Sequence, residues 1–230
     1  MKEKIYTIPI NEAVDADTEC PFCTIAKRLE EEAVEYTLGA AMMEPDYRIL
    51  CNGKGFCNHH FSQLYKKPNK LSLALILDSR FDELKKQFSK NKPTAEKSGL
   101  FRKAKQTSVR NDTCVICDRI NSTLDRYAEV FFYMWKADKT FSDRILSSKG
   151  FCIPHFYYLA EMAEKHLAHP EEFIGPVFEK ELSELDRIHG EVHHFTLKFD
   201  YRNSDLPWGN AKDAPLRAVE KSAGYIENNE

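Results

Sequence analysis

The sequence predicts an all-α protein made of two homologous helical units, each built around a Cys3His metal site. Three observations support this fold class. The stretch "GKGFCNHHF" begins at Gly53 and returns as "SKGFCIPHF" at Ser148. Each stretch is preceded by a Cys-x-x-Cys pair, "CPFC" from Cys20 and "CVIC" from Cys114. Apolar residues recur mainly at helical spacing, and no segment alternates strongly enough to indicate a large sheet.

The composition sets the broad class of the protein. The chain has 230 residues, of which 42% are hydrophobic and 30% charged, so it can bury a core without disulfides. A formal net charge of −3 disfavours a protein built around nucleic acid. The N-terminus "MKEKIYTIPINEA" lacks the apolar core of a signal peptide, and the longest apolar run, Leu71 to Leu77, is too short to span a bilayer. We therefore expect a cytoplasmic protein with no membrane partner, whose seven cysteines stay reduced.

The spacing of the cysteines indicates an internal duplication. The second copy follows the first by 94 residues at the Cys-x-x-Cys pair and by 95 residues at the Cys-x-x-His pair. Between these pairs, "YRIL" from Tyr47 is matched by "DRIL" from Asp143. A long period with two copies is typical of a duplicated domain rather than of a solenoid. Cys51 has no counterpart in the second copy, and we interpret it as a core residue.

In the first copy the apolar pattern predicts three helices. The first follows "CPFC" with an apolar face formed by Ile25, Leu29, Ala33 and Tyr36. The second begins at "GFC" and presents Phe61, Leu64 and Tyr65. The third closes the copy with a face formed by Leu71, Leu75, Asp78, Phe81, Leu84 and Phe88.

The second copy repeats this order. A helix follows "CVIC" with Ile120, Leu124, Tyr127, Phe131 and Met134, and another begins at the second "GFC" with Phe156, Leu159 and Met162. The closing helix begins near Pro170, taken as a first-turn proline, and presents Ile174, Phe178, Leu182, Leu185 and Val192. The tail reads as a loop and one short helix. We expect four regions: a first unit at 1–90, a basic linker at 91–112, a second unit at 113–195, and a docking tail at 196–230.

The repeated residues have the chemistry of a zinc site. Cys-x-x-Cys brings two thiolates together in a tight turn, and Cys-x-x-His at a helix start places residues i and i+3 on one face. Four such ligands suit tetrahedral Zn²⁺. The expected metal ligands are Cys20, Cys23, Cys57 and His60 for one ion, and Cys114, Cys117, Cys152 and His155 for the other. We predict two zinc ions per chain, each bound within one copy, and an iron–sulfur cluster remains the alternative because the same ligands hold one.

A redox function is a second interpretation of the first pair. "ECPFCTIAKRLEEEAVEY" resembles the glutaredoxin active site, in which Cys-Pro-aromatic-Cys opens a helix. That resemblance covers one helix. The chain after Tyr36 predicts further helices instead of the strands and cis-proline loop of that fold, and "CVIC" lacks the proline. The sequence favours structural sites over a catalytic thiol.

Two further clusters are weaker candidates. His189, His193 and His194 lie near the end of the last long helix. His189 and His193, at positions i and i+4, form either a two-histidine metal face or part of a solvated surface, and the sequence favours the surface. The linker region 85–110 carries nine lysines and arginines against Glu96. Such a strip contacts RNA in some proteins, but a solvated linker is the more frequent role of a charge run, so nucleic acid is a less favoured partner.

The paired motifs and the tail "FDYRN…PWG…KDAPLRAVEKSAG" resemble an uncharacterised family of bacterial proteins known only as a domain of unknown function. The resemblance extends from "KIYTIPINEA" to the tail. It implies a cytoplasmic bacterial protein and carries no family activity. Trp208 is a plausible anchor for tail docking. The predicted function is a zinc-stabilised binding or adaptor module for a protein or small-molecule partner, and the alternative is a thiol-based sensor or enzyme.

Overall fold

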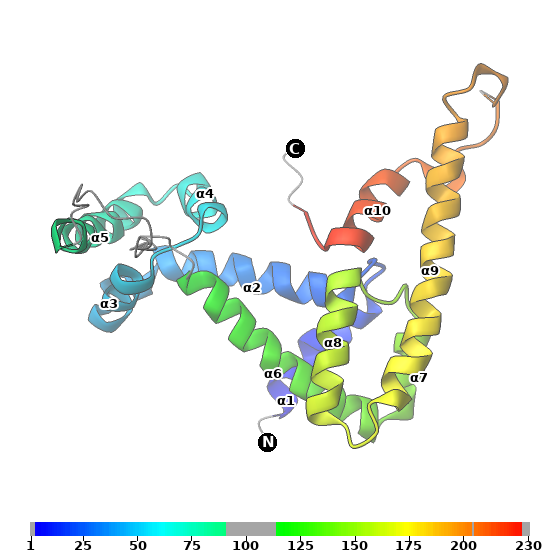
Figure 1. Ribbon diagram of the computed structural model, residues 1–230, viewed down its shortest axis with the longest axis horizontal. Helices are drawn as coiled ribbons and strands as arrows, with labels where there is room; N and C mark the ends of the chain where they lie inside the picture. The colour runs from blue at the N-terminus through cyan, green and yellow to red at the C-terminus, as the bar shows by residue number, and fades with distance from the viewer. Residues whose placement is uncertain (1–2, 91–113, 204, 227–230) are drawn as a thin grey trace, which may run out of the picture. The chain divides into compact units, whose positions relative to one another are not determined.

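The computed structural model describes residues 3–90, 114–203 and 205–226 (Figure 1). Within these ranges the chain is helical and has no strand, which confirms the all-α class. The helices are α1 Glu3–Asp15, α2 Pro21–Leu38, α3 Pro45–Lys54, α4 Asn58–Lys66, α5 Lys70–Lys90, α6 Val115–Ala137, α7 Lys139–Ser147, α8 Ile153–His166, α9 Glu171–Leu197 and α10 Ala214–Ala223. Short 3₁₀ turns lie at Ala40–Met43, Tyr201–Asn203 and Gly209–Ala211. None of these helices combines the length and apolar character needed to cross a membrane.

The contacts divide the chain into two compact units. Unit 1 contains residues 1–28 and 123–230, and unit 2 contains residues 29–122. This division does not follow the boundaries expected from the repeat, because α2 and α6 each contribute residues to both units. The expected basic linker at 91–112 lies outside the described residues.

The helices expected after the motifs are present. α2 and α6 begin directly after Cys20 and Cys114, and α4 and α8 begin directly after Cys57 and Cys152. Pro170 is the N-cap of α9, one position before its expected place in the first turn. The sequence did not predict α1, α3 or α7.

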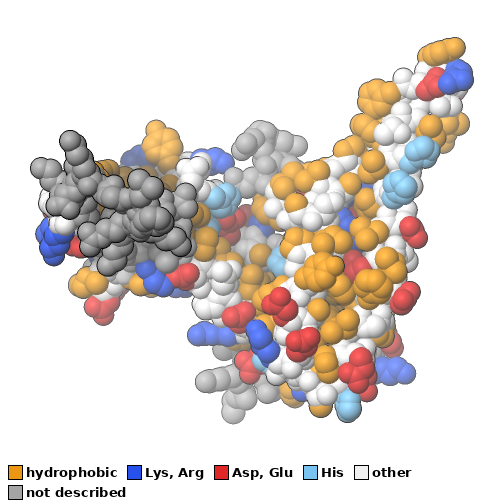
Figure 2. Space-filling model, in the orientation of Figure 1, with side chains coloured by type: hydrophobic (Ala, Val, Ile, Leu, Met, Phe, Trp, Pro, Cys, Tyr) orange, Lys and Arg blue, Asp and Glu red, His pale blue; other side chains and the backbone are white. Residues whose placement is uncertain are grey.

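The expected buried faces of the two closing helices are wrong. In α5 the buried residues are Ser72, Leu73, Ile76 and Arg80, whereas Leu71, Phe81 and Phe88 are exposed. In α9 the buried residues are Phe173, Val177, Glu181, Glu184 and Ile188, whereas Phe178 and Leu182 are exposed. Each helix therefore buries a different face from the one expected, because charged side chains occupy some of its buried positions. The exposed apolar residues of α9 contribute to the hydrophobic surface visible over α8 and α9 (Figure 2).

Phenylalanines form the centre of the unit 1 core. Phe131 of α6 packs edge-to-face on Phe22, Phe141, Phe151 and Phe173, with ring centroids 5.4–6.0 Å apart. Phe22 lies between two predicted ligand cysteines, and Phe151 directly precedes a third. Such aromatic pairs add to the free energy of burial and have preferred geometries. The core therefore fixes the positions of the segments that carry these cysteines.

Unit 2 has its own core. Ala33, Val34 and Leu38 of α2 pack with Cys51, Phe56, Leu64, Leu73 and Ile76, and with residues 114–116 at the start of α6. Cys51 is 1% exposed in this cluster, as expected for a core thiol. Phe56 and Ile116 are the core residues next to the predicted ligand cysteines of unit 2, as Phe151 and Phe22 are in unit 1.

The two "GFC" segments have the same backbone conformation. Gly55 and Gly150 have φ of 71° and 73°, in the left-handed region that favours glycine. The following N-cap residues, Cys57 and Cys152, are both extended, with φ of −72° and −70°. This turn directs each Cys-x-x-His pair into the first turn of its helix.

Candidate metal centres

The eight predicted ligands form two groups, but their pairing differs from the prediction. Site A consists of Cys20, Cys23, Cys152 and His155, and site B consists of Cys57, His60, Cys114 and Cys117. Each Cys-x-x-Cys pair therefore meets the Cys-x-x-His pair of the other copy. The expectation of pairing within a copy is wrong, although each site lies within a single unit.

In site A the histidine nitrogen lies among three sulfurs. His155 Nδ1 is 3.5 Å from Cys20 Sγ, 3.3 Å from Cys23 Sγ and 3.1 Å from Cys152 Sγ. The Sγ atoms of Cys23 and Cys152 are 3.5 Å apart. Cys20 and Cys152 are buried, and Cys23 is half-buried.

Site B repeats this arrangement with different chain segments. His60 Nδ1 is 3.2 Å from the Sγ atoms of both Cys57 and Cys114, and 3.3 Å from Cys117 Sγ. Cys57 Sγ and Cys117 Sγ are 3.9 Å apart. Cys114 is buried, while the other two cysteines are half-buried.

These separations fit one tetrahedral ion in each site. With Zn–S near ~2.3 Å and Zn–N near ~2.0 Å, the edges of a tetrahedron are about 3.8 Å between sulfurs and about 3.5 Å between sulfur and nitrogen. The S···S distances of 3.5 and 3.9 Å and the S···N distances of 3.1–3.5 Å lie close to these edges. The donor set of three sulfurs and one imidazole is one that zinc prefers.

Helix N-termini also contribute to the sites. The Cys57 sulfur caps α4 by accepting the backbone N–H of His60. The sulfur of Cys20, the residue directly before α2, accepts the backbone N–H of Cys23 in the first turn of that helix. Backbone donors and the positive end of the helix dipole favour the thiolate form that binds metal.

The electrostatics of site A concentrate negative charge on one sulfur. Thiol hydrogen bonds from Cys20 and Cys23, with a further contribution from His155, hold the pKa of Cys152 far below its usual range. Burial raises the pKa of Cys20, and the hydrogen bond with Cys152 raises that of Cys23 to about 12. Without metal, the site therefore holds one thiolate and two protonated thiols.

Site B distributes its charge differently. Burial opposes ionisation of Cys114, but its hydrogen bond with His60 and backbone donors lower the pKa of this thiol to about 6. Burial disfavours the charged form of His60 as well, yet Cys114 and Glu30 raise the pKa of its imidazole to about 10. Burial raises the pKa of Cys117. A thiolate–imidazolium pair, which a divalent ion can replace, is thus favoured in the metal-free site.

The outer partners of the two histidines distinguish the sites. Glu30 Oε1 lies 3.0 Å from His60 Nε2, in an ion-pair contact rather than a linear hydrogen bond, and 2.6 Å from His59 Nε2. A carboxylate behind a ligating histidine fixes its tautomer and raises its basicity. In site A the His155 ring instead lies 5.9 Å from the Phe22 ring and 6.4 Å from the Tyr158 ring.

A comparison with models of protein families shows the family of this chain. The model of a family of unknown function, DUF6062, matches residues 1–229. The chain belongs to this family. No curated protein and no solved structure gives a significant match. DUF6062 membership confirms the resemblance to an uncharacterised family and brings no activity with it.

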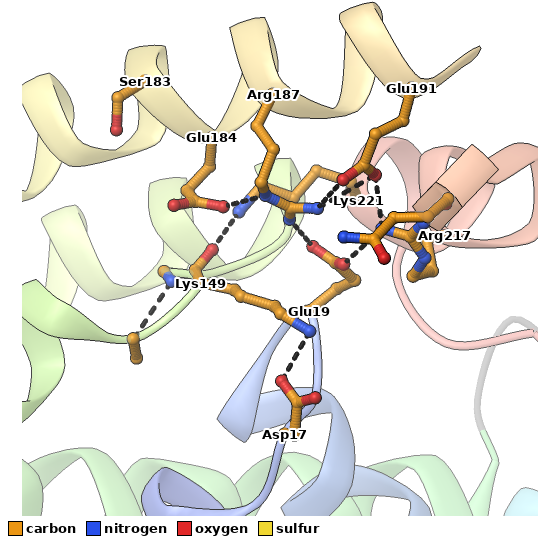
Figure 3. Close-up of polar contacts among 12 residues, drawn as sticks. Asp17, Glu19, Lys149, Ser183, Glu184, Arg187, Glu191, Arg217 and Lys221 are labelled. Carbon is orange, nitrogen blue, oxygen red and sulfur yellow. Dashed lines mark hydrogen bonds and ion pairs between the residues drawn. The ribbon is translucent and has the colours of Figure 1, made fainter. Parts of the chain in front are cut away.

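An ion-pair network that the sequence did not reveal lies beside site A in this DUF6062 member (Figure 3). Glu19, directly before Cys20, is buried and pairs with Arg187 of α9 at 2.6 Å and Arg217 of α10 at 3.4 Å. Glu191 joins both arginines, at 3.1 Å and 2.5 Å. The repeat could not predict this network, because the tail motif that supplies Arg217 has no aligned partner in the first copy.

The weaker candidates remain separate from the two sites. Within the described ranges, His189 and His193 join no group of three or more metal-ligating side chains, and His194 Nε2 lies 2.9 Å from the carbonyl oxygen of Pro207. Trp208 is 39% exposed and packs against Phe195 at the end of α9, with ring centroids 5.7 Å apart.

Proposed function

We propose that this DUF6062 protein binds two zinc ions at sites A and B and uses them as structural centres of a binding or adaptor module. The convergence of three sulfurs and one imidazole nitrogen in each group carries this proposal. Four protein ligands complete a tetrahedron and leave no open position for a reacting water, which is the pattern of structural zinc. The free cysteines are consistent with function in a reducing compartment such as the cytoplasm.

The close packing of the ligand atoms supports a single ion over an iron–sulfur cluster. A cluster contains several iron and sulfide atoms, so its protein ligands are held farther apart than those of one ion. In both sites the histidine nitrogen lies within 3.5 Å of all three sulfurs, which leaves room for one ion between them.

The proposed ions act as cross-links between distant parts of the sequence. Site A joins the start of α2 to the start of α8, and site B joins the start of α4 to the start of α6. A cross-link that closes a long loop removes conformational freedom from the unfolded chain. Metal binding therefore contributes directly to folding, and its free energy is linked to that of the fold.

Two measurements on protein purified without added metal test the proposal. Elemental analysis should give about two zinc ions per chain, and X-ray absorption should show three sulfur neighbours and one nitrogen neighbour around zinc. The Cys51→Ser variant is the matched control, since this buried thiol belongs to neither site and its variant should keep both ions. Iron with acid-labile sulfide, or a chain without metal, would overturn the zinc assignment.

A further inference from the structure

The C-terminal helix α10 is anchored beside site A by a buried lysine. Lys221 is 0% exposed, and its Nζ lies 2.6 Å from the carbonyl oxygen of Lys149 and 2.7 Å from Glu181 Oε2. The other carboxylate oxygen of Glu181 accepts the backbone N–H of Phe151 at 2.5 Å. A buried charge is stable only with such partners. Lys221 therefore fixes α10 to the turn that carries Cys152.

The segment after this lysine reaches the sulfurs themselves. A Cβ atom on Gly224 would lie 3.7 Å from Cys23 Sγ and 3.8 Å from Cys152 Sγ. Gly224 has φ of 88°, a backbone conformation that favours glycine. The next backbone N–H, that of Tyr225, lies close enough to the Cys23 sulfur to lower the pKa of this thiol, against the larger effect of Cys152. The tail thus forms an outer wall of site A.

A pocket of about 280 Å³ opens between this wall and the start of α2. Its lining consists of Thr18, Glu19, Cys20, Cys23, Thr24, Lys27, Glu220 and Tyr225. Cys23 is half-buried, whereas Cys20 and Cys152 are buried, so Cys23 is the most exposed cysteine of the site. The Lys27 ammonium lies over the Tyr225 ring, 4.7 Å from its centroid, and places a positive charge at the pocket.

We propose that this pocket binds small thiols, which exchange with Cys23 as ligands of the metal in site A. The inference rests on the proposed function, because it requires an ion in that site. In the exchange the bond between the ion and Cys23 Sγ breaks, and a bond between the ion and the incoming sulfur forms. The proton of the incoming thiol passes to the Cys23 sulfur, and nothing is oxidised or reduced.

The residues of the pocket have separate roles in the exchange. Lys27 attracts the incoming sulfur as it loses its proton, since a cation near a thiol favours its anionic form. Tyr225 and Glu220 belong to the pocket lining, and the volume of about 280 Å³ limits the ligand to a small molecule. Site A therefore accepts a thiol ligand from solvent through the pocket between the tail and the start of α2.

Cadmium-113 resonance on the full-length protein tests this inference, because cadmium occupies thiolate-rich zinc sites and each site gives its own signal. The Cys57→Ser variant identifies the signal of site B by its loss. Stepwise addition of 2-mercaptoethanol should shift or broaden the site A signal at concentrations that leave the site B signal unchanged. If both signals change together, or if the site B signal changes at a lower thiol concentration, the inference is overturned and the proposed function stays intact. Absence of two cadmium signals would overturn both.

Two variants and a matched control locate the effect in the pocket. Lys27→Ala should raise the thiol concentration needed at site A by about two- to fivefold, as expected for loss of one surface charge interaction. Thr24→Trp should fill the pocket and raise it further, with the site B signal reporting that the chain is folded. Arg28→Ala removes the neighbouring charge of α2, which lies outside the pocket lining and pairs with Glu12, and should change nothing. An equal effect of the two charge variants would contradict a role for Lys27.

Discussion

The Sγ atoms of Cys23 and Cys152 lie 3.5 Å apart although 129 residues separate them along the chain. Cys23 belongs to the first copy of the repeat, and Cys152 belongs to the second. Each group therefore combines a Cys-x-x-Cys pair from one of the two similar sequence stretches with the Cys-x-x-His pair from the other.

Double variants distinguish this pairing from pairing within a copy. Cys20→Ser combined with Cys152→Ser removes two ligands of site A only, and the protein should keep about one zinc per chain at site B. Cys20→Ser combined with Cys57→Ser damages both sites, and the protein should keep none. Elemental analysis of the folded proteins measures the difference, and the reverse pattern would show that each copy binds its own ion.

Glu30 should strengthen metal binding at site B alone. Glu30→Gln removes the charge behind His60, and loss of such an outer partner typically costs about 10–100-fold in metal affinity. Competition with a chelator measures the affinity of each site. Glu35→Gln is the control on the same helix, because Glu35 pairs with the exposed Lys67 and belongs to neither metal group. Equal affinities in both variants would contradict a role for the carboxylate.

Gly150 should tolerate no side chain. Its φ is +73°, and a Cβ atom there would lie inside van der Waals distance of the buried Glu181 carboxylate. Gly150→Ala should lower the free energy of unfolding by at least about 2 kcal/mol, from the backbone conformation and the clash together. Denaturant unfolding of the zinc-loaded protein measures this loss.

Gly190 provides the contrasting case for that experiment. It lies within α9, and a Cβ atom there meets no atom within 4 Å. Gly190→Ala should raise the free energy of unfolding by up to about 1 kcal/mol, since alanine is the better helix former. A loss of similar size in both variants would show that the space around Gly150 does not decide its role.

Metal binding at site A should release protons. The pKa values of Cys20 and Cys23 are raised in the metal-free site, to about 12 for Cys23, so both thiols hold their protons at neutral pH. Both protons must leave when the thiolates bind an ion, and metal affinity should therefore rise with pH across the neutral range. Calorimetry of the Cys57→Ser variant in buffers of different ionisation enthalpy counts these protons. Affinity independent of pH would contradict the protonated thiols.

The sequence was sufficient to predict which eight side chains converge, but not which of them lie together. Residue type and spacing predict all eight, because a tetrahedral zinc site would require side chains of these types. Pairing depends on where the helix after each Cys-x-x-Cys pair takes the chain. The 18 residues of α2 span about 27 Å at 1.5 Å per residue, so the rest of the first copy begins far from Cys20 and Cys23. The repeat period contains no information on this distance.

Buried charges explain why the faces of α5 and α9 could not be predicted. Arg80 binds the carbonyl oxygen of Asn52, and Glu181 binds Lys221 and the Phe151 backbone, so both occupy core positions. An apolar pattern assigns charged residues to solvent. The partners that make their burial favourable lie 28 to 40 residues away in sequence.

The pairing also determines which of the two sites is the first to have all its residues translated. All ligands of site B lie between residues 57 and 117, inside the interval that separates the two halves of site A. At about 5–20 residues per second, synthesis of the 38 residues from Cys117 to His155 takes about 2–8 s. Site B can fill during this time, while Cys20 and Cys23 wait for ligands that have not yet been translated. Site B is therefore the first of the two proposed zinc sites whose four ligands are all translated.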